Sequence, residues 1–317
     1  MEPERPSAES VVRNLQSTSE RIRALAEAGY ERREISTILD VRYQHVRNVL
    51  LAAGITGGLS RSRQPLQPSL SRRRFMDVEG NIRQYLEGNA DGKDRGRQPV
   101  ARYASFDYCF NYFQSFREAR ETKRLASPGQ VEMSCLHLGF YLASWGMLRG
   151  STFLLQRSLP AYKPVIQVIA TMDDALWGLD AHCYTEANID VLVACRDDLV
   201  EGFGRQNRPS DTLITKVMLG VFGNVPAFDT FVKLGLGVSG SGRRALQEAL
   251  REVSRSYRTH SEVIERYHAQ VTTLDFADGR HTSRYYTRAK VLDMALFVEG
   301  QRLSRDGGKR PAGDQQL

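Results

Sequence analysis

The chain has 317 residues, of which 41% are hydrophobic and 26% charged, and its formal net charge is +7. This balance excludes a chain too polar to fold and leaves room for one large or two modest domains. The start MEPERPSAESVV is acidic and polar where an export signal needs a basic end and an apolar run, so we expect a cytoplasmic protein. The four cysteines form no C-x-x-C pair of the kind that zinc or redox chemistry uses, and we expect no cofactor.

The positive charge is concentrated near the N-terminus. Residues 11–75 hold twelve Arg against five acids, whereas residues 173–201 hold eight acids and a single Arg. A cluster of arginine favours a polyanionic partner such as nucleic acid. The first region is therefore predicted to attract nucleic acid and the second to repel it.

In chain order, the first predicted element is a small helical domain at 17–55, which begins at the cap-like STSE. Residues 56–100 are rich in Gly, Pro, Ser and Arg and predict a flexible basic linker, with one weak helix at 76–87. Apolar residues recur every three or four positions over 101–302, with no convincing period-2 stretch, which predicts an all-helical domain. With a disordered tail at 303–317, the expected fold class is all-α.

Residues 30–50, YERREISTILDVRYQHVRNVL, show two short helical patterns on either side of a tight turn. Gly29 is placed to end the preceding helix as a C-cap glycine. Apolar side chains at fixed positions would hold the helices together, and polar ones early in the second helix would face outward. The predicted apolar frame is Ile22, Leu25, Ile35, Leu39, Val41, Val46 and Val49, and the predicted outward residues are Arg42, Tyr43, Gln44, Arg47 and Asn48.

This pattern resembles that of bacterial helix-turn-helix proteins, in which it forms a compact N-terminal module. The resemblance implies binding to double-stranded DNA, where Arg pairs with guanine and Gln or Asn with adenine. Two residues depart from the usual motif: Ser36 stands where Ala is common and Asp40 where Gly is common in the turn. Ser is small, and Asp tolerates the left-handed conformation. A trihelical unit used only for protein contacts is the alternative.

The predicted linker carries arginines with no acid between residues 61 and 74. They are candidates to lie along phosphates or in a minor groove. The alternative is a solvated linker. These residues are Arg61, Arg63, Arg72, Arg73 and Arg74.

Two further patterns invite a functional interpretation. The glycines of GLGVSGSGRRALQEAL match G-x-G-x-x-G, but the preceding TFVKLGL is helical in pattern, so we expect a helix-to-helix connection and not a dinucleotide site.

The acidic helix at 185–203 places Glu186 and Asp190 on one face, where they are candidate metal ligands. We favour a solvated face with no metal; docking on the basic N-terminal domain is a third interpretation.

The segment 214–237 resembles, in its second half, the part of helix-hairpin-helix DNA glycosylases that carries the catalytic aspartate. By that likeness Asp229 would activate an attacking nucleophile, with Lys216 the nearby amine. The glycine hairpin of that family is absent, and helix capping by Asp229 is the alternative. RAKVLDMALF (288–297) is similar to uncharacterised helical bacterial proteins with a K…P…D…D-M skeleton, a likeness that transfers no activity.

The aromatic run at 103–118 has the spacing of a buried stripe at Phe106, Phe110 and Phe113. Tyr108, Asn111 and Tyr112 lie off that stripe and are candidates to stack on bases. The apolar segment 133–156 is too short and interrupted to span a membrane.

Two functions follow from these patterns. The first is a sequence-selective DNA-binding protein, either a transcriptional regulator or a mobile-element or defence-associated protein, whose helical domain serves oligomerisation or regulation. A homo-oligomer is expected because one such module rarely provides enough specificity. The alternative is a nucleic-acid-processing enzyme, glycosylase-like or metal-dependent, which the helix-turn-helix brings to DNA.

Overall fold

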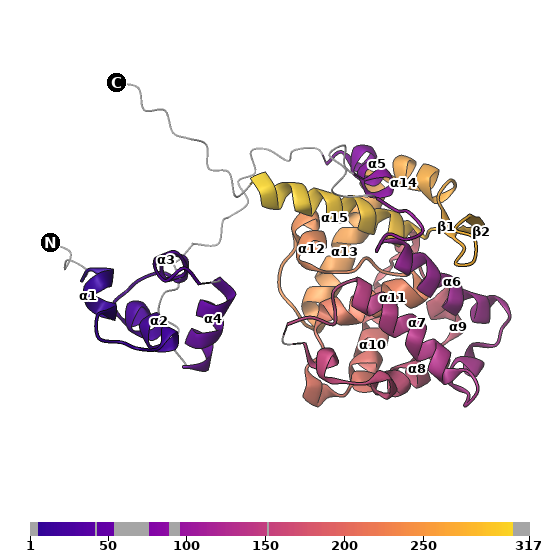
Figure 1. Ribbon diagram of the computed structural model, residues 1–317. Coiled ribbons are helices and arrows are strands. Elements are labelled where there is room, and N and C mark those ends of the chain that lie inside the picture. Colours follow the sequence, from indigo (N-terminus) through magenta and orange to yellow (C-terminus); the bar gives the residue numbers. More distant parts are fainter. Residues whose placement is uncertain (1–5, 42, 54–75, 89–95, 151, 307–317) are drawn as a thin grey trace, which may run out of the picture. The chain divides into compact units, whose positions relative to one another are not determined.

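A computed structural model describes residues 6–41, 43–53, 76–88, 96–150 and 152–306 of the protein (Figure 1). The chain divides into two compact units, Met1–Arg74 and Phe75–Leu317. The described residues are mostly helical, and the single sheet among them has two short strands. The predicted all-α class is confirmed at this level, and the short sheet is an addition that the sequence did not predict.

The N-terminal unit contains α1 (Ala8–Val12), α2 (Thr18–Glu27), α3 (Arg32–Ile38) and α4 (Tyr43–Ala52). A capping box between Ser17 and Glu20 begins α2 at the predicted STSE. Helix α1 was not predicted; it packs on α2, and nearby the Tyr30 hydroxyl donates to the carbonyl oxygen of Pro6 at 2.8 Å. The unit therefore extends N-terminal to residue 17, where the sequence placed its start.

This unit has a hydrophobic core of its own. The residues of the predicted apolar frame all lie in it or pack against it, with Leu39, Val41 and Val49 partly buried at its edge. Burying an apolar side chain contributes about 1.5–3 kcal/mol, so in a core this small each buried residue accounts for a sizeable part of the stability. The buried residues are Ile22, Leu25, Ala26, Tyr30, Ile35, Val46 and Leu50.

The second unit begins with α5 (Val78–Glu87), a segment that the sequence assigned to the linker. Val78, Ile82 and Tyr85 are buried, and the helix packs along the C-terminal helix α15 (Arg288–Asp306). The compact unit therefore starts at Phe75 and not at residue 101. A ten-residue helix has little stability alone, and tertiary packing supplies what its weak local pattern lacks.

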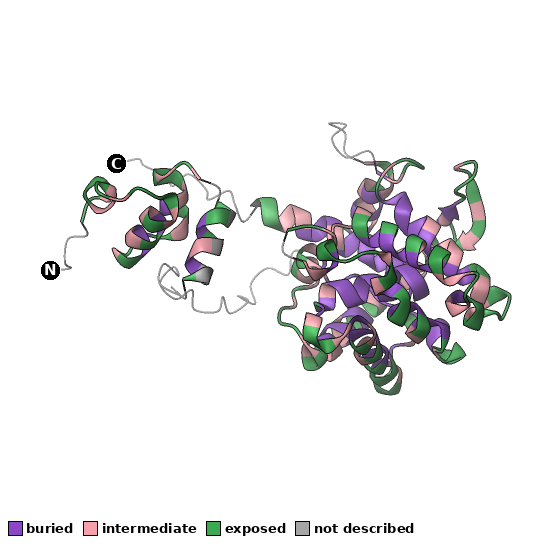
Figure 2. Cartoon of the chain, turned by 60° about the horizontal axis from the view of Figure 1, so that its bottom comes forward, coloured by how far each residue is buried: buried purple, intermediate pink, exposed green. Residues whose placement is uncertain are grey.

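The remaining helices of this unit surround a single core, and Figure 2 shows buried residues gathered on their inner sides. The central helix is α11, in which every residue but Thr212 is buried. The elements between α5 and α15 are α6 (Ala104–Glu118), η1 (Thr122–Ala126), α7 (Val131–Ser144), η2 (Phe153–Gln156), η3 (Leu159–Tyr162), α8 (Lys163–Ala170), α9 (Asp174–Trp177), η4 (Ala181–Cys183), α10 (Glu186–Phe203), η5 (Arg205–Asn207), α11 (Asp211–Phe222), α12 (Thr230–Leu236), α13 (Arg243–Thr259), α14 (Ser261–His268), β1 (Thr272–Leu274) and β2 (His281–Tyr285).

The two strands pair antiparallel, with Thr272 opposite Tyr285 and Leu274 opposite His281. Their anchor is the buried carboxylate of Asp107 on α6, which accepts hydrogen bonds from the backbone N–H of Leu274 at 3.0 Å and from Arg97 at 3.1 Å. Strands of this length are too short to give an alternating sequence pattern.

Helices α12 and α15 make a close backbone contact at Gly235 and Gly300. A Cβ atom at Gly235 would overlap the carbonyl oxygen of Leu296, and one at Gly300 would overlap that of Phe231. The first glycine of the G-x-G-x-x-G pattern thus serves helix packing, while Gly237, with φ 75°, ends α12. The predicted helix-to-helix connection is confirmed.

Of the described helices, none combines the length and the apolar character that crossing a membrane requires. The apolar segment at 133–156 covers most of α7 and all of η2. Leu138, Tyr141, Leu142 and Leu154 of this segment belong to the core of the second unit, whereas Phe140 is exposed.

Candidate functional site

The turn between α3 and α4 has the geometry that the sequence suggested. Asp40 takes the left-handed conformation with φ 49°, and the Ser36 hydroxyl donates to the carbonyl oxygen of Val41 at 2.6 Å. Both departures from the usual motif therefore support the turn: Asp by tolerating its backbone, and Ser by satisfying one of its carbonyl groups.

On α4, the side chains of Tyr43 and Arg47 are exposed, while Val46 and Leu50 point into the core. His45, which the sequence did not single out, is exposed as well. Two of the five predicted base-reading side chains are thus placed at the surface. The other candidates, namely Arg42, the side chains of Gln44 and Asn48, and Arg61, Arg63, Arg72, Arg73 and Arg74, lie outside the described residues.

In the second unit, a cavity of about 250 Å³ lies among α5, α7, α11, α12, α15 and the start of α6; we call it the Lys216 cavity. The rings of Tyr85 and Tyr103 stack with centroids 4.4 Å apart, and Phe297 meets both edge-on at 6.3 Å. Flat aromatic walls of this kind suit a planar ligand. Its lining is Tyr85, Arg102, Tyr103, Ser144, Trp145, Gly146, Arg149, Lys216, Asp229, Phe231, Asp293, Phe297 and Gln301.

Lys216 reaches the cavity from the buried helix α11 and is only 5% exposed. Its Nζ donates to the carbonyl oxygen of Trp145 at 2.6 Å. Burial lowers the pKa of this amine, and the charges of Asp229 and Asp293 oppose the shift in part. A lysine with a lowered pKa has more of its neutral form, which is the form that acts as a nucleophile or base.

Asp229 is the N-cap of α12, as the capping interpretation predicted. Its Oδ1 accepts hydrogen bonds from the backbone N–H of Phe231 at 2.9 Å and of Val232 at 3.0 Å. Burial raises the pKa of the carboxyl, while these hydrogen bonds and Lys216 act in the other direction. Its Oδ2 accepts no hydrogen bond from the described residues, so capping leaves one oxygen available to a ligand.

Lys216 and Asp229, the two catalytic candidates of the sequence, therefore line the same cavity. No salt bridge joins them in the described part of the chain, where each takes its hydrogen bonds from backbone groups. A buried amine and a buried carboxyl that do not neutralise each other are costly for stability, and such pairs are typical of reaction centres.

Beside the cavity lies a buried ion pair that sequence reasoning did not identify as part of a site. Lys290 is fully buried, with its Nζ 2.9 Å from Oδ2 of Asp293 and 3.0 Å from the Tyr85 hydroxyl. The same ammonium lies 4.7–4.8 Å from the ring centroids of Tyr85, Phe106 and Trp145. The sequence feature that could have indicated this pair is a Lys and an Asp three residues apart in the otherwise apolar AKVLDMALF.

The acidic face of α10 is covered by α13 of the same unit. Glu186 binds Arg251 at 2.7 Å, and Asp190 accepts from Gln247 at 3.0 Å. The two candidate metal ligands thus have side-chain partners, and among the described residues no group of three His, Cys, Asp or Glu is suited to hold a metal. The neighbouring Asp197 pairs with Arg196 and Arg243.

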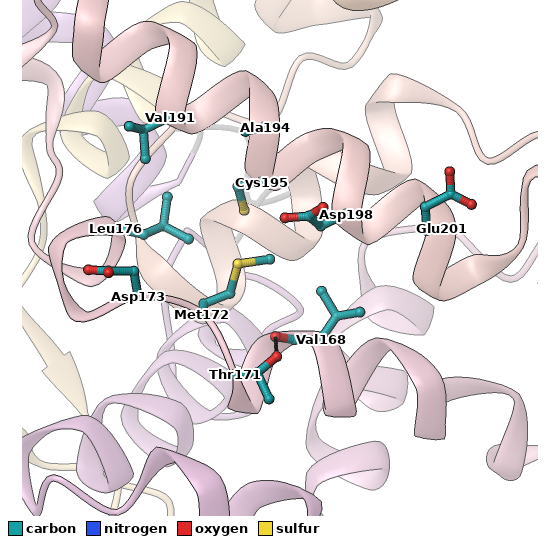
Figure 3. A pocket seen from close by; sticks show the side chains of 10 residues that line it. All are labelled: Val168, Thr171, Met172, Asp173, Leu176, Val191, Ala194, Cys195, Asp198 and Glu201. Carbon is teal, nitrogen blue, oxygen red and sulfur yellow. Dashed lines mark hydrogen bonds between the residues drawn. The ribbon is translucent and has the colours of Figure 1, made fainter.

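A groove of about 460 Å³ between α8 and α10 is the larger hollow (Figure 3), and its described lining is apolar apart from Thr171, the Cys195 thiol and three carboxylates. Burial raises the pKa of the Cys195 thiol strongly, which makes it unreactive. With no cation among its described lining residues, the groove offers no acid–base pair. It is lined by Val168, Thr171, Met172, Asp173, Leu176, Val191, Ala194, Cys195, Asp198 and Glu201.

The predicted aromatic stripe is confirmed, because Phe106, Phe110 and Phe113 are all buried. The three candidates for base stacking have structural partners. Tyr108 donates to the carbonyl oxygen of Pro99, Asn111 to that of Leu274, and Tyr112 stacks on His137 with centroids 4.0 Å apart.

The Lys216 cavity therefore combines three features: a lysine with a lowered pKa, an aspartate with a raised pKa (Asp229), and aromatic walls. Tyr85 and Asp293 belong to it although they are more than 200 residues apart in the chain. No protein-family model, no curated protein and no solved structure matches the chain.

Proposed function

We propose that the protein is a nucleic-acid-processing enzyme that its N-terminal helix-turn-helix unit directs to double-stranded DNA. The observation that carries this proposal is the convergence of Lys216 and Asp229 on one aromatic-walled cavity. A domain used only for oligomerisation has no use for a buried amine and a buried carboxyl that share a cavity, whereas groups with shifted pKa values in a cavity are typical of enzyme active sites.

The DNA-directing role is supported by the turn that Ser36 and Asp40 form and by the exposed Tyr43 and Arg47 on α4. An arginine that binds guanine in the major groove contributes about 1–3 kcal/mol of discrimination. Arg47→Ala is therefore expected to weaken binding to the preferred sequence about tenfold or more in a gel-shift assay. Arg23→Ala, an exposed arginine on α2, is the matched control, and an equal loss there would contradict base reading by α4.

The cavity volume of about 250 Å³ suits a single base, not a base pair, so the target base has to leave the helical stack. Neutral Lys216 attacks C1′ of the sugar and gives up a proton, which a water molecule passes to Asp229. The glycosidic C–N bond breaks, and the base leaves with the electron pair and takes a proton from water. The sugar remains bound to Nζ and opens to an imine, which borohydride reduces to a stable amine.

The test uses full-length protein and oligonucleotides that carry altered bases, in duplex and single-stranded form. We expect base release and, with borohydride, a covalent adduct between protein and DNA. Lys216→Met should abolish the adduct, and Asp229→Asn should slow base release about a hundredfold or more while DNA binding stays intact. Lys123→Met, at an exposed lysine on η1, controls for non-specific reaction of lysines.

The second candidate function is the sequence-selective regulator, which the separate hydrophobic core of the N-terminal unit favours. In that role the second unit would hold copies of the chain together or respond to a ligand. Selective DNA binding without base release or adduct from any of the oligonucleotides would select this function. Light scattering would give the oligomeric state in either case.

A further inference from the structure

Positive charge exceeds negative charge around the Lys216 cavity. Among its described lining residues, Arg102, Arg149 and Lys216 stand against Asp229 and Asp293. Asp293 is already paired with Lys290, which leaves Asp229 as the acid available to three cations. Lys216 is buried, whereas Arg102 and Arg149 are exposed at the edge of the cavity. An anion that enters the cavity therefore meets an excess of positive charge, which favours its binding.

Neither Arg102 nor Arg149 has a carboxylate or side-chain hydrogen-bond partner among the described residues, although both line the cavity. Both residues are exposed at the edge of the cavity, so water solvates their guanidinium groups and their N–H donors are free to bind an anion there.

Both arginines lie close to other residues that line the cavity. The Arg102 guanidinium lies 4.9 Å from the ring centroid of Tyr103, one of the aromatic walls. The Arg149 guanidinium lies over Gly146, where a Cβ atom would come within 3.6 Å of it and where φ is 75°. Both arginines line the same cavity as Lys216, and burial acts with their positive charges to lower the pKa of the lysine.

We propose that Arg102 and Arg149 form a phosphate subsite at the Lys216 cavity, which binds the phosphate attached to a nucleoside whose base lies against the aromatic wall. Guanidinium groups suit phosphate because their paired N–H donors match two phosphate oxygens. The inference rests on the proposed function, whose site it extends. The phosphate belongs either to a strand, as a diester, or to a free nucleotide, as a monoester, and the chemistry of recognition is shared.

The two tryptophans of the chain provide a direct probe. Trp145 lines the cavity and Trp177 is buried on α9, while the N-terminal unit contains none, so a fluorescence change reports on the second unit alone. We would titrate the full chain with adenosine, with adenosine 5′-monophosphate and with a single-stranded trinucleotide of deoxyadenosine. Trp145→Phe should remove the response, which assigns the signal to the cavity.

We expect each phosphate-bearing probe that enters the cavity to bind about tenfold or more tightly than adenosine, since hydrogen bonds to charged groups are the strong ones. Arg102→Gln and Arg149→Gln should each remove most of that preference, and Arg102→Lys should retain part of it because the charge remains. Arg120→Gln is the control: this arginine is exposed just beyond the opposite end of α6. Unfolding curves check that each variant is folded.

A preference shown by the trinucleotide alone identifies a strand diester, and one shown by the monophosphate identifies a free nucleotide; both support the subsite. Equal affinity for adenosine and the phosphate-bearing probes overturns it, as does an equal loss in Arg120→Gln. If the phosphate preference holds but no oligonucleotide gives base release or adduct, the subsite stands and the proposed chemistry fails. Base release without the phosphate preference removes the subsite alone.

Discussion

The Ser36 hydroxyl donates a hydrogen bond to the carbonyl oxygen of Val41, 2.6 Å away, and so links the end of α3 to the start of α4. Without this donor the carbonyl would lose its partner within a turn that is partly buried. Ser36→Ala is therefore expected to reduce the stability of the N-terminal unit by about 1 kcal/mol.

Hydrogen exchange of the α3 and α4 amides in the full chain measures this loss without interference from the second unit. Thr37→Ala is a neighbouring control, because Thr37 is exposed and its hydroxyl bonds only within α3, to the carbonyl oxygen of Arg33. Equal protection in Ser36→Ala and wild type would show that the hydrogen bond does not stabilise the turn.

The pH dependence of base release should report on Lys216 and Asp229. Burial lowers the pKa of Lys216 from 10.5 and raises that of Asp229 from 3.8. The reaction requires the lysine neutral and the aspartate ionised, so the rate should rise with pH through both values and show no falling limb from either group.

In Asp229→Asn the lower step should disappear and the remaining rate should fall about a hundredfold or more. Single-turnover assays across a pH series measure both effects. A rate that falls as pH rises through the pKa of Lys216 would mean that the ammonium form is required, which contradicts nucleophilic attack by the amine.

Asp107 gives a separate prediction on stability. Burial raises the pKa of this carboxyl to about 6, against the opposing charge of Arg97 and the hydrogen bond from Tyr286. The contribution of its proton to stability is present below about pH 3.8 and is lost as pH rises through about 6. The wild type should therefore lose about 3 kcal/mol of unfolding free energy across that window through this group.

Asp107→Asn removes the titrating group and should flatten this part of the pH profile. Urea unfolding of the wild type and of Asp107→Asn at a series of pH values measures the difference between their unfolding free energies. A difference that does not change with pH would rule out Asp107 as the titrating group.

The Lys290–Asp293 pair is expected to couple strongly. Removing one partner of a buried ion pair leaves the other charge without compensation and costs about 3–5 kcal/mol. Lys290→Met and Asp293→Asn should each destabilise the second unit, and the double variant should lose less than the sum of the two. Additive losses in a double-mutant cycle would show that the two side chains are energetically independent.

The sequence predicted those parts of the structure that depend on local spacing. The apolar frame around Ile35 and Val46 and the capping at Ser17 follow from residues that are neighbours on one helix. Helices α1 and α5 were missed or underrated because they are short and depend on tertiary contacts, as Tyr85 shows by its hydrogen bond with the distant Lys290.

The same distinction applies to the Lys216 cavity. Lys216 and Asp229 lie within the segment 214–237, whose local resemblance predicted both as catalytic candidates. Arg102, Tyr85 and Asp293 come from helices or helix ends far apart in the chain, and no local pattern relates them. Packing around α11 brings these residues together, and tertiary packing of this kind cannot be predicted from the spacing of residues in the sequence.

The contact between Gly235 and Gly300 has a consequence for recognising chains of the same design. Asp229 caps a helix of only seven residues, and the position of that helix is set where its backbone touches α15, which also carries Asp293. A side chain at either glycine would push the two carboxylates apart. A distant chain with this reaction centre should therefore keep both positions small, even where the aromatic walls have changed to fit another ligand.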